Sequence, residues 1–220
     1  MAVIRAAVFD AYGTLLDVHA AMGRHAARLG PDWQRMSAEW RAKQIEYTWV
    51  RSLAGSAHHR DFWTLTQEAL GFVAARYNVS DKALLADLLQ AYRRLDAYPD
   101  AVSVLTALRD RGVARGILSN GEPGMLSDAV RSAGIAELLD HVLSVEDVGV
   151  FKPDPRVYRL VTERFGLAAG DIGFVSSNPW DAFGAVSFGF QVYWVNRSGQ
   201  PDEYGLQGRV TEVTDLSAVA

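Results

Sequence analysis

A carboxylate, Asp10, directly follows the apolar run at residues 3–9 and precedes the turn residue Gly13. An apolar run of this length predicts a strand that is buried on both faces of a parallel sheet. The carboxylate then lies at the carboxyl end of the strand, where open α/β sheets bind their ligands. Because burying a charge is costly, Asp10 indicates a functional group, with an ordinary turn residue as the alternative.

Three further groups of polar residues lie in or before loops in the second half of the chain. Ser119 and Asn120 follow one predicted strand, Lys152 lies in a later loop, and the segment 176–181 follows another predicted strand. Each group alone is ordinary, because such residues often form turns or cap helices. Parallel strands bring their carboxyl ends to one edge of a sheet, so we expect these groups to meet Asp10 there.

The spacing of apolar residues predicts alternating helices and strands after residue 99, which implies βαβ units and a parallel sheet. Before that point the pattern is helical. We therefore expect a helical segment, residues 15–98, inserted into a core formed by residues 1–14 and 99–220. The predicted strands are 3–9, 113–118, 142–144, 172–175, 191–195 and 209–213, and the predicted helices are 19–29, 38–53, 61–77, 81–95, 100–110, 123–133 and 154–165, with Ser37, Ser80 and Asp154 as N-caps.

A polar stripe runs along the predicted helix 38–53. Arg41, Gln44, Thr48 and Ser52 follow the spacing that places residues on one helical face. Aromatic and aliphatic residues flank this stripe, which indicates that the face is enclosed by other parts of the protein. From the residues alone, an arginine that faces solvent is the alternative.

Composition restricts the classes of partner and of chemistry. The 220 residues carry a net charge of −4, which argues against a nucleic acid or an anionic membrane as partner. The absence of cysteine excludes disulfides, thiolate metal sites and cysteine nucleophiles. Without an apolar leader or a run of ~20 apolar residues, we expect a soluble, cytoplasmic protein. The adjacent His58 and His59 are expected to be surface residues and not metal ligands.

The segment Asp10-x-Tyr12-Gly13-Thr14-Leu15 resembles the first motif of the haloacid dehalogenase superfamily. Phosphatases of this superfamily carry a second Asp where this chain has Tyr12, so the resemblance favours the L-2-haloacid dehalogenases. Two more segments are similar to that family, namely Ser-Ser-Asn-x-Trp-Asp at residues 176–181 and Trp-Arg-x-Lys-Gln-Ile-Glu-Tyr-Thr-Trp at residues 40–49.

This resemblance extends over residues 6–195 and implies an α/β fold, with a Rossmann-like parallel sheet and an inserted all-helical cap. It implies hydrolysis of short-chain L-2-haloacids to 2-hydroxyacids, with inversion and through an ester on Asp10. It also implies that the enzyme needs no metal or other cofactor and that it forms a homodimer. A magnesium-dependent phosphatase of the same fold and a non-catalytic anion-binding domain are the alternatives.

The resemblance further implies a role for each site residue. Asp10 would be the nucleophile, and Asp181, held by Ser176 and Asn178, would activate water. The Gln that follows the arginine in the family is Ala42 here, so the chain departs from the family at that contact. The implied catalytic residues are Asp10, Thr14, Lys152, Ser176, Asn178 and Asp181, and the implied substrate or halide contacts are Ala11, Tyr12, Arg41, Phe62, Ser119, Asn120, Tyr158 and Trp180.

Overall fold

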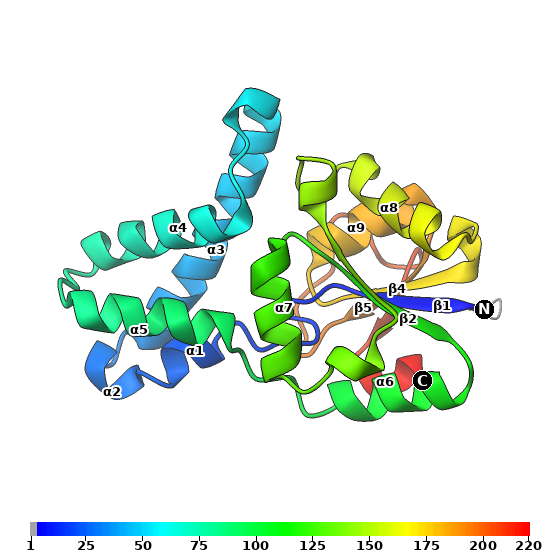
Figure 1. Ribbon diagram of the computed structural model, residues 1–220, viewed down its shortest axis with the longest axis horizontal. Coiled ribbons are helices and arrows are strands. Elements are labelled where there is room, and N and C mark those ends of the chain that lie inside the picture. Colours follow the sequence, from blue (N-terminus) through cyan, green and yellow to red (C-terminus); the bar gives the residue numbers. More distant parts are fainter. Residues whose placement is uncertain (1–3) are drawn as a thin grey trace.

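The computed structural model describes residues 4–220, and a parallel sheet of six strands lies at its centre (Figure 1). The strands lie side by side in the order β3-β2-β1-β4-β5-β6, and every pairing is parallel. The predicted α/β fold is confirmed, although Val3 of the predicted first strand lies outside the described residues. The strands are β1 (Ala6–Phe9), β2 (Ala114–Ser119), β3 (His141–Ser144), β4 (Ile172–Ser176), β5 (Gln191–Val195) and β6 (Thr211–Val213).

Four helices cover the two faces of this sheet. In the view of Figure 1, α8 and α9 lie above the strands and α6 lies below them. The chain runs outward from β1 to β2 and β3, and then returns to β4 on the other side of β1. Such a reversal of strand order places a ligand crevice at the carboxyl ends of β1 and its neighbours. The four helices are α6 (Ala101–Asp110), α7 (Pro123–Ser132), α8 (Pro155–Phe165) and α9 (Pro179–Phe188).

All helices between β1 and α6 lie together on one side of the sheet (Figure 1). The predicted helix 19–29 is in fact two short helices, because the chain leaves the helical path between them at His25. The long helix α3 packs against α4, and α1 packs against α5. The five helices are α1 (Ala20–Gly23), α2 (Ala26–Leu29), α3 (Trp33–Ala54), α4 (Phe62–Arg76) and α5 (Lys82–Arg93).

Two of the predicted helix caps are wrong, and one is confirmed. Ser37 lies inside α3, where it is buried and its hydroxyl contacts His19 Nδ1 at 2.8 Å. The helix begins earlier because packing of its first turn, including buried Met36, outweighs the local preference for a cap. Asp81, not Ser80, caps α5 by accepting hydrogen bonds from two backbone N–H groups. Asp154 caps α8 as predicted.

The chain passes twice between the sheet and the helical segment, and the two passages are bonded to each other. Tyr98 N donates to the Leu15 carbonyl at 2.9 Å, and Asp17 N donates to the Asp96 carbonyl at 2.9 Å. Leu16 and Ala97 form an antiparallel bridge between these bonds. We propose that a core of residues 1–14 and 99–220 and a cap of residues 15–98 meet at this pair of connections.

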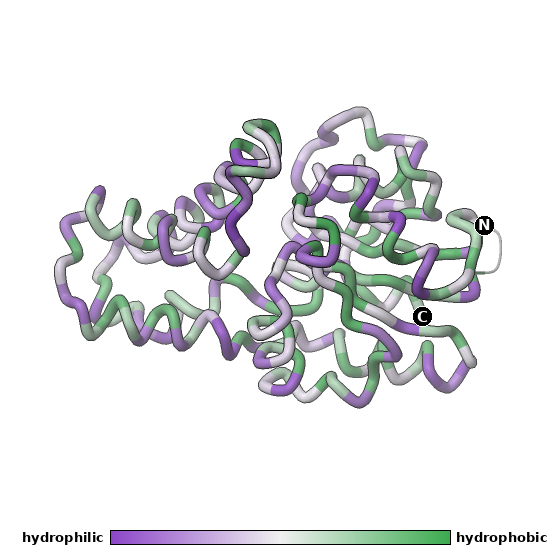
Figure 2. Tube along the Cα trace, turned by 45° about the horizontal axis from the view of Figure 1, so that its top comes forward, coloured by the Kyte–Doolittle hydropathy of each residue, from purple (hydrophilic) through white to green (hydrophobic). Residues whose placement is uncertain are grey.

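Apolar side chains fill the space between the sheet and its helices. Phe9, Phe174 and Val175 are fully buried, and hydrophobic residues, green in Figure 2, recur along the chain throughout the larger part of the molecule. Burying such side chains contributes about 1.5–3 kcal/mol each to folding, so the sheet forms a rigid base for residues at its edge. Within residues 4–220, no helix is long and apolar enough to span a membrane.

Candidate active site

Asp10 lies at the carboxyl end of β1, in the middle of the sheet, and its side chain is almost fully buried. Thr14 Oγ1 donates to Asp10 Oδ2 at 3.3 Å. Asn178 Nδ2 donates to the same oxygen at 2.7 Å. The turn that returns Thr14 to the carboxylate passes through Gly13 at φ 94°, a conformation that favours glycine.

Lys152 joins two carboxylates in the interior. Its side chain is completely buried, and Nζ lies 3.1 Å from Asp10 Oδ1 and 2.9 Å from Asp181 Oδ2. The same ammonium group lies over the Phe174 ring, with Nζ 5.1 Å from the ring centroid. A buried charge is tolerated when it is paired and hydrogen-bonded, as it is here. The sequence prediction that the ends of separate strands bring these groups together is therefore confirmed.

Asp181 is fully buried on the first turn of α9, and its contacts differ from the prediction. Tyr158 Oη donates to Asp181 Oδ1 at 2.7 Å, and Lys152 occupies the other oxygen. The side chain of Asn178 is directed to Asp10 instead, and Ser176 Oγ accepts a hydrogen bond from Asn178 N at 3.2 Å. The prediction that Ser176 and Asn178 hold Asp181 is therefore wrong, because Lys152 and Tyr158 hold its two oxygens and the side-chain amide of Asn178 donates to Asp10.

Burial changes the pKa values of Asp181 and Tyr158. It raises the pKa of Asp181, and the nearby ammonium of Lys152 opposes that shift. Burial also raises the pKa of Tyr158 well above its usual value, and the Asp181 carboxylate adds to the shift. Tyr158 therefore stays protonated near neutral pH and donates a hydrogen bond to a carboxylate that binds its proton more readily than usual.

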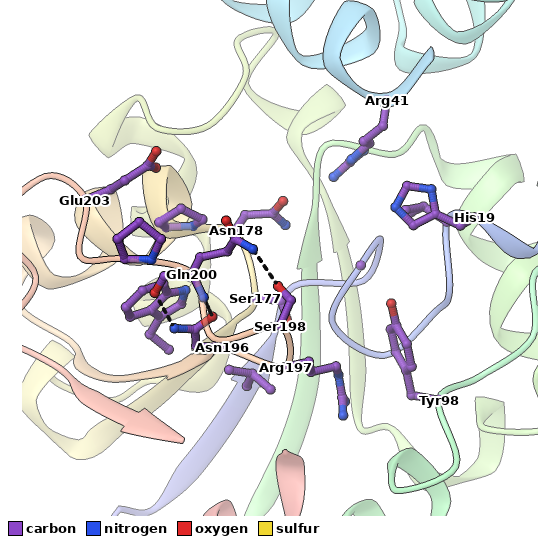
Figure 3. Close-up of a pocket in the computed structure, with 16 residues that line it drawn as sticks. His19, Arg41, Tyr98, Ser177, Asn178, Asn196, Arg197, Ser198, Gln200 and Glu203 are labelled. Carbon is purple, nitrogen blue, oxygen red and sulfur yellow. Dashed lines mark hydrogen bonds between the residues drawn. The ribbon is translucent and has the colours of Figure 1, made fainter. Parts of the chain in front are cut away.

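Arg41 reaches from α3 toward the end of β1. Its Nη2 donates to the Tyr12 carbonyl at 3.1 Å, and its guanidinium points into a cavity of about 420 Å³ (Figure 3). Asn178 and Gly13 also line this cavity, so it opens beside Asp10. The arginine belongs to an enclosed polar face and does not simply face solvent.

The rest of the polar stripe supports that face. Gln44 is fully buried, accepts a hydrogen bond from Tyr92 Oη at 3.2 Å and donates to Thr66 Oγ1 at 3.0 Å. Tyr92 stacks on Tyr12, with ring centroids 5.6 Å apart. Tyr92 was not among the predicted site residues, although a tyrosine in the apolar face of an amphipathic helix was a usable signal.

Several buried polar atoms near the site have no hydrogen-bond partner among residues 4–220, and two of them belong to predicted contact residues. These two are Asn120 Nδ2 and Tyr12 Oη. Asn120 Oδ1 accepts a hydrogen bond from Lys152 N at 3.0 Å, which fixes the side chain and leaves the amide hydrogens free. Burial raises the pKa of Tyr12 well above its usual value, so its hydroxyl remains a donor. Unsatisfied buried donors are costly, and they indicate groups reserved for a ligand.

The other predicted contact residues surround the same region. Phe62 is buried, with its ring centroid 6.0 Å from that of Tyr12. Trp180 packs edge-on against Trp49 of the cap at 5.7 Å. Ser119 is buried, and its hydroxyl oxygen accepts a hydrogen bond from Gly121 N, so its own hydrogen can still be donated. Ala11 is buried, whereas Ala42 is exposed.

The two adjacent histidines, His58 and His59, lie in different surroundings. His58 is exposed, as predicted, but His59 is partly buried and lies 3.0 Å from Glu146 of the core. Its ring also packs on Phe151, so it connects the cap to the core. Within the described residues no cluster of three histidine or acidic side chains could hold a metal ion. The ammonium of Lys152 lies between Asp10 and Asp181, the two acids of the site.

Comparison with known proteins agrees with this geometry. Residues 4–189 match the haloacid dehalogenase-like hydrolase family. The chain is 44% identical over 215 residues to (S)-2-haloacid dehalogenase 4A of Burkholderia cepacia, an alignment that covers 97% of this chain and 92% of the relative. It is also 44% identical to (S)-2-haloacid dehalogenase 1 of Pseudomonas sp. strain CBS-3, with 97% and 94% covered.

A solved structure shows the same architecture. The L-2-haloacid dehalogenase of Xanthobacter autotrophicus with covalently bound chloropropionic acid superposes with a TM-score of 0.89 at 36% identity, covering 98% of this chain and 96% of that one. The matches extend over nearly the whole chain, and the arrangement of side chains around Asp10 agrees with them. The chain belongs to the haloacid dehalogenase-like hydrolases, and within them to the (S)-2-haloacid dehalogenase family.

Proposed function

We propose that the protein hydrolyses short-chain L-2-haloacids to 2-hydroxyacids, with inversion at the α-carbon, through an ester on Asp10. The observation that carries this proposal is the buried Lys152, which bonds Asp10 and Asp181 at once. It holds one carboxylate as a desolvated, oriented nucleophile and the other beside it as a base. The named activity of the relatives supports the same reaction.

In the first step, an oxygen of Asp10 attacks the α-carbon of the haloacid from the face opposite the halogen. A carbon–oxygen bond forms, the carbon–halogen bond breaks, and its electron pair leaves with the halide. Lys152 and Asn178 hold the two oxygens of the carboxylate, so the attacking group is aimed before the substrate arrives. Attack from the rear explains the inversion.

Hydrogen-bond donors on the side of the α-carbon opposite to Asp10 receive the leaving halide. Arg41 extends into the cavity beside Asp10, and the free amide hydrogens of Asn120 lie in the buried interior. The free hydroxyl of Tyr12 adds a third donor. Donors that face charge as it develops lower the barrier. The rings of Phe62 and Trp180 would supply the apolar walls around the carbon–halogen bond.

A second anionic group, the substrate carboxylate, also needs donors. Ser119 keeps its hydroxyl hydrogen available because its oxygen already accepts from Gly121 N. We assign the carboxylate to Ser119 and to the backbone N–H groups of Ala11 and Tyr12 beside it. The positive charge of Lys152 compensates for bringing two anions together.

In the second step, water attacks the carbonyl carbon of the ester on the Asp10 side. Asp181 takes a proton from this water, and its raised pKa favours that role over an ordinary exposed carboxylate. The bond between the ester carbonyl carbon and the substrate oxygen then breaks, and the departing alkoxide takes the proton from Asp181 to become the 2-hydroxyacid. Asp10 keeps one oxygen from water and loses the remaining proton to solvent as it returns to a carboxylate. Tyr158 orients Asp181, while Ser176 and Thr14 bond the backbone of the loop that carries Asn178.

Phosphatase chemistry receives less support from the residues. Tyr12 occupies the position of the second acid of the phosphatases, and its ring is buried between Phe62 and Tyr92. A solved phosphatase of the superfamily is only 23% identical to this chain with a TM-score of 0.62, a likeness of fold alone. A protein that only bound anions would gain nothing from two buried carboxylates, Asp10 and Asp181, at its binding site.

The origin of the product oxygen tests the proposal. Enzyme in large excess over L-2-chloropropionate, in ¹⁸O-labelled water, should complete one turnover with unlabelled oxygen in the new hydroxyl group. The peptide that contains Asp10 should gain the label. If the label enters the product directly while Asp10 stays unlabelled, water attacks the α-carbon and the covalent mechanism is wrong.

A homodimer and a cytoplasmic location are also proposed. The helix α3 presents Val50 and Leu53 with 58% and 88% of their surface exposed, and such neighbouring apolar side chains suit a contact between two copies. Sedimentation at several protein concentrations tests the dimer. Cell fractionation tests the location, which rests on the sequence-based expectation.

A further inference from the structure

Gly184 lies in the middle of α9, three residues after Asp181, and it is buried. Residues three apart lie on the same side of a helix, so Gly184 faces the surroundings of Asp181. Its backbone conformation is ordinary for any residue, since its φ is not positive. Glycine weakens a helix interior relative to alanine, so a helical glycine without a special φ requires a packing reason.

The packing reason is the space that a side chain would occupy. A Cβ atom at position 184 would lie 2.7 Å from Pro153 Cβ and 2.9 Å from Tyr158 Cζ. The Tyr158 hydroxyl would lie closer still, at a separation that real Cβ atoms essentially never show. These neighbours belong to the site, because Pro153 follows Lys152 and the Tyr158 hydroxyl donates to Asp181 Oδ1.

We infer that Gly184 is a positioning residue for the second step of the reaction, because the absence of a side chain lets the Tyr158 hydroxyl reach Asp181. This inference rests on the proposed function. A methyl group at position 184 displaces the hydroxyl and removes a hydrogen bond from the Asp181 carboxylate. None of the three atoms nearest to a Cβ at position 184 belongs to the nucleophile Asp10, so ester formation should continue while ester hydrolysis slows.

The test compares Gly184→Ala with Gly71→Ala. Gly71 is also helical, in α4, and has an ordinary φ, and a Cβ added there would meet no atom within 4 Å, which makes it a matched control. In Gly184→Ala we expect the steady-state rate to fall by about 10- to 100-fold, because general base catalysis typically contributes about 10²- to 10⁴-fold and here the base is misplaced but not removed. A burst of halide release and an ester on the Asp10 peptide, detected by mass spectrometry, should precede the slow phase. Gly71→Ala should behave as the wild type.

A double-mutant cycle with Tyr158→Phe separates the clash from a general packing defect. If the hydroxyl is the group that needs the space, adding Gly184→Ala to Tyr158→Phe should cost less than about threefold, since energies of contacting residues do not add. Multiplicative losses, a wild-type rate in Gly184→Ala, or unfolding of Gly184→Ala in both backgrounds would each overturn the inference.

The proposed function and this inference fail in different ways. A wild-type enzyme that releases no halide and forms no ester would overturn the proposed function. A crystal structure of Gly184→Ala gives a readout that does not depend on activity. A displaced Tyr158 hydroxyl there supports the inference, whereas an intact bond between Tyr158 and Asp181 contradicts it.

Discussion

The core and the cap contribute to the site in different ways. In the core, Lys152 and the oxygens of Asp10 and Asp181 are bonded to one another or to neighbouring side chains. Arg41 comes from the cap, and one hydrogen bond to the Tyr12 carbonyl links it to the core. The core therefore fixes the reacting groups before substrate binds, whereas the cap supplies a donor with hydrogen bonds left to make. We expect substitutions in the core to affect both stability and chemistry, and substitutions at Arg41 to affect chemistry alone.

The largest effect is expected at Lys152. Lys152→Ala leaves the buried carboxylates of Asp10 and Asp181 without their shared cation, which should destabilise the protein by roughly 3–5 kcal/mol. Halide release should become undetectable. Denaturant unfolding measures the first effect and a halide electrode measures the second. Because the loss of stability arises from unpaired charge, Asp181→Asn combined with Lys152→Ala should recover part of it. No recovery would show that Lys152 acts mainly by packing.

Arg41→Ala should lower the turnover number by about 10²-fold or more, the usual cost of losing a donor at a developing charge. The unfolding midpoint should stay close to that of the wild type, because the side chain is partly exposed and makes a single bond to the core. Lysine should not restore the rate, since it lacks the planar fork of donors.

A matched control for Arg41 lies on the same helix. Arg35 is 78% exposed and forms only a loose ion pair with Asp32 at 3.6 Å. Arg35→Ala should leave both the rate and the stability unchanged. If Arg41→Ala and Arg35→Ala gave the same small effect, the cap would contribute no group to the reaction, and the contrast between the two regions would be wrong.

The strand ends explain why the core part of the site was predictable. A short apolar run that stops at a polar residue is visible in the sequence, and parallel pairing then brings Asp10, Lys152 and Asp181 to one edge. The partner of Asp181 was not predictable in this way. Whether Asn178 turns to Asp10 or to Asp181 depends on its side-chain rotamer and on the exact placement of the loop, which spacing along the chain does not determine.

The cap was less predictable from the residues alone. The stripe on α3 indicated an enclosed face, but only the resemblance assigned Arg41 to the halide. The start of α3 was misplaced at Ser37 because the burial of Met36 outweighs a local capping signal. Tyr92 was missed because a tyrosine in a helical apolar face is usually a core residue, and its bond to Gln44 requires two helices to be docked.

A smaller effect, on pH dependence, is expected in the core. Burial raises the pKa of Asp181, and the hydrogen bond from Tyr158 opposes that rise. Asp181 must be ionised to accept a proton from water, so activity should be lost as the pH falls through this pKa. Tyr158→Phe removes the opposing hydrogen bond and should move the acid limb of the turnover profile to higher pH. A limb that moves to lower pH, or does not move, would show that another group controls it.

The smallest effect, no change at all, is expected on chelation. The carboxylates of Asp10 and Asp181 each have one oxygen bonded to the ammonium of Lys152. This lysine therefore supplies the positive charge that a metal ion would otherwise provide between the two acids. Magnesium prefers an octahedral set of oxygen ligands, and two residues after Asp10, where the phosphatases carry a second acid, this chain has Tyr12. Halide release from L-2-chloropropionate should therefore be the same after dialysis against excess EDTA, and adding magnesium to the dialysed enzyme should not raise it.

A magnesium-dependent phosphatase assayed in parallel shows that the chelator works. Activity that disappears with EDTA and returns with magnesium would mean that Asp10, Lys152 and Asp181 need a metal ion to react. The core would then not hold all its reacting groups in place before substrate binds, and the contrast drawn with Arg41 of the cap would be wrong.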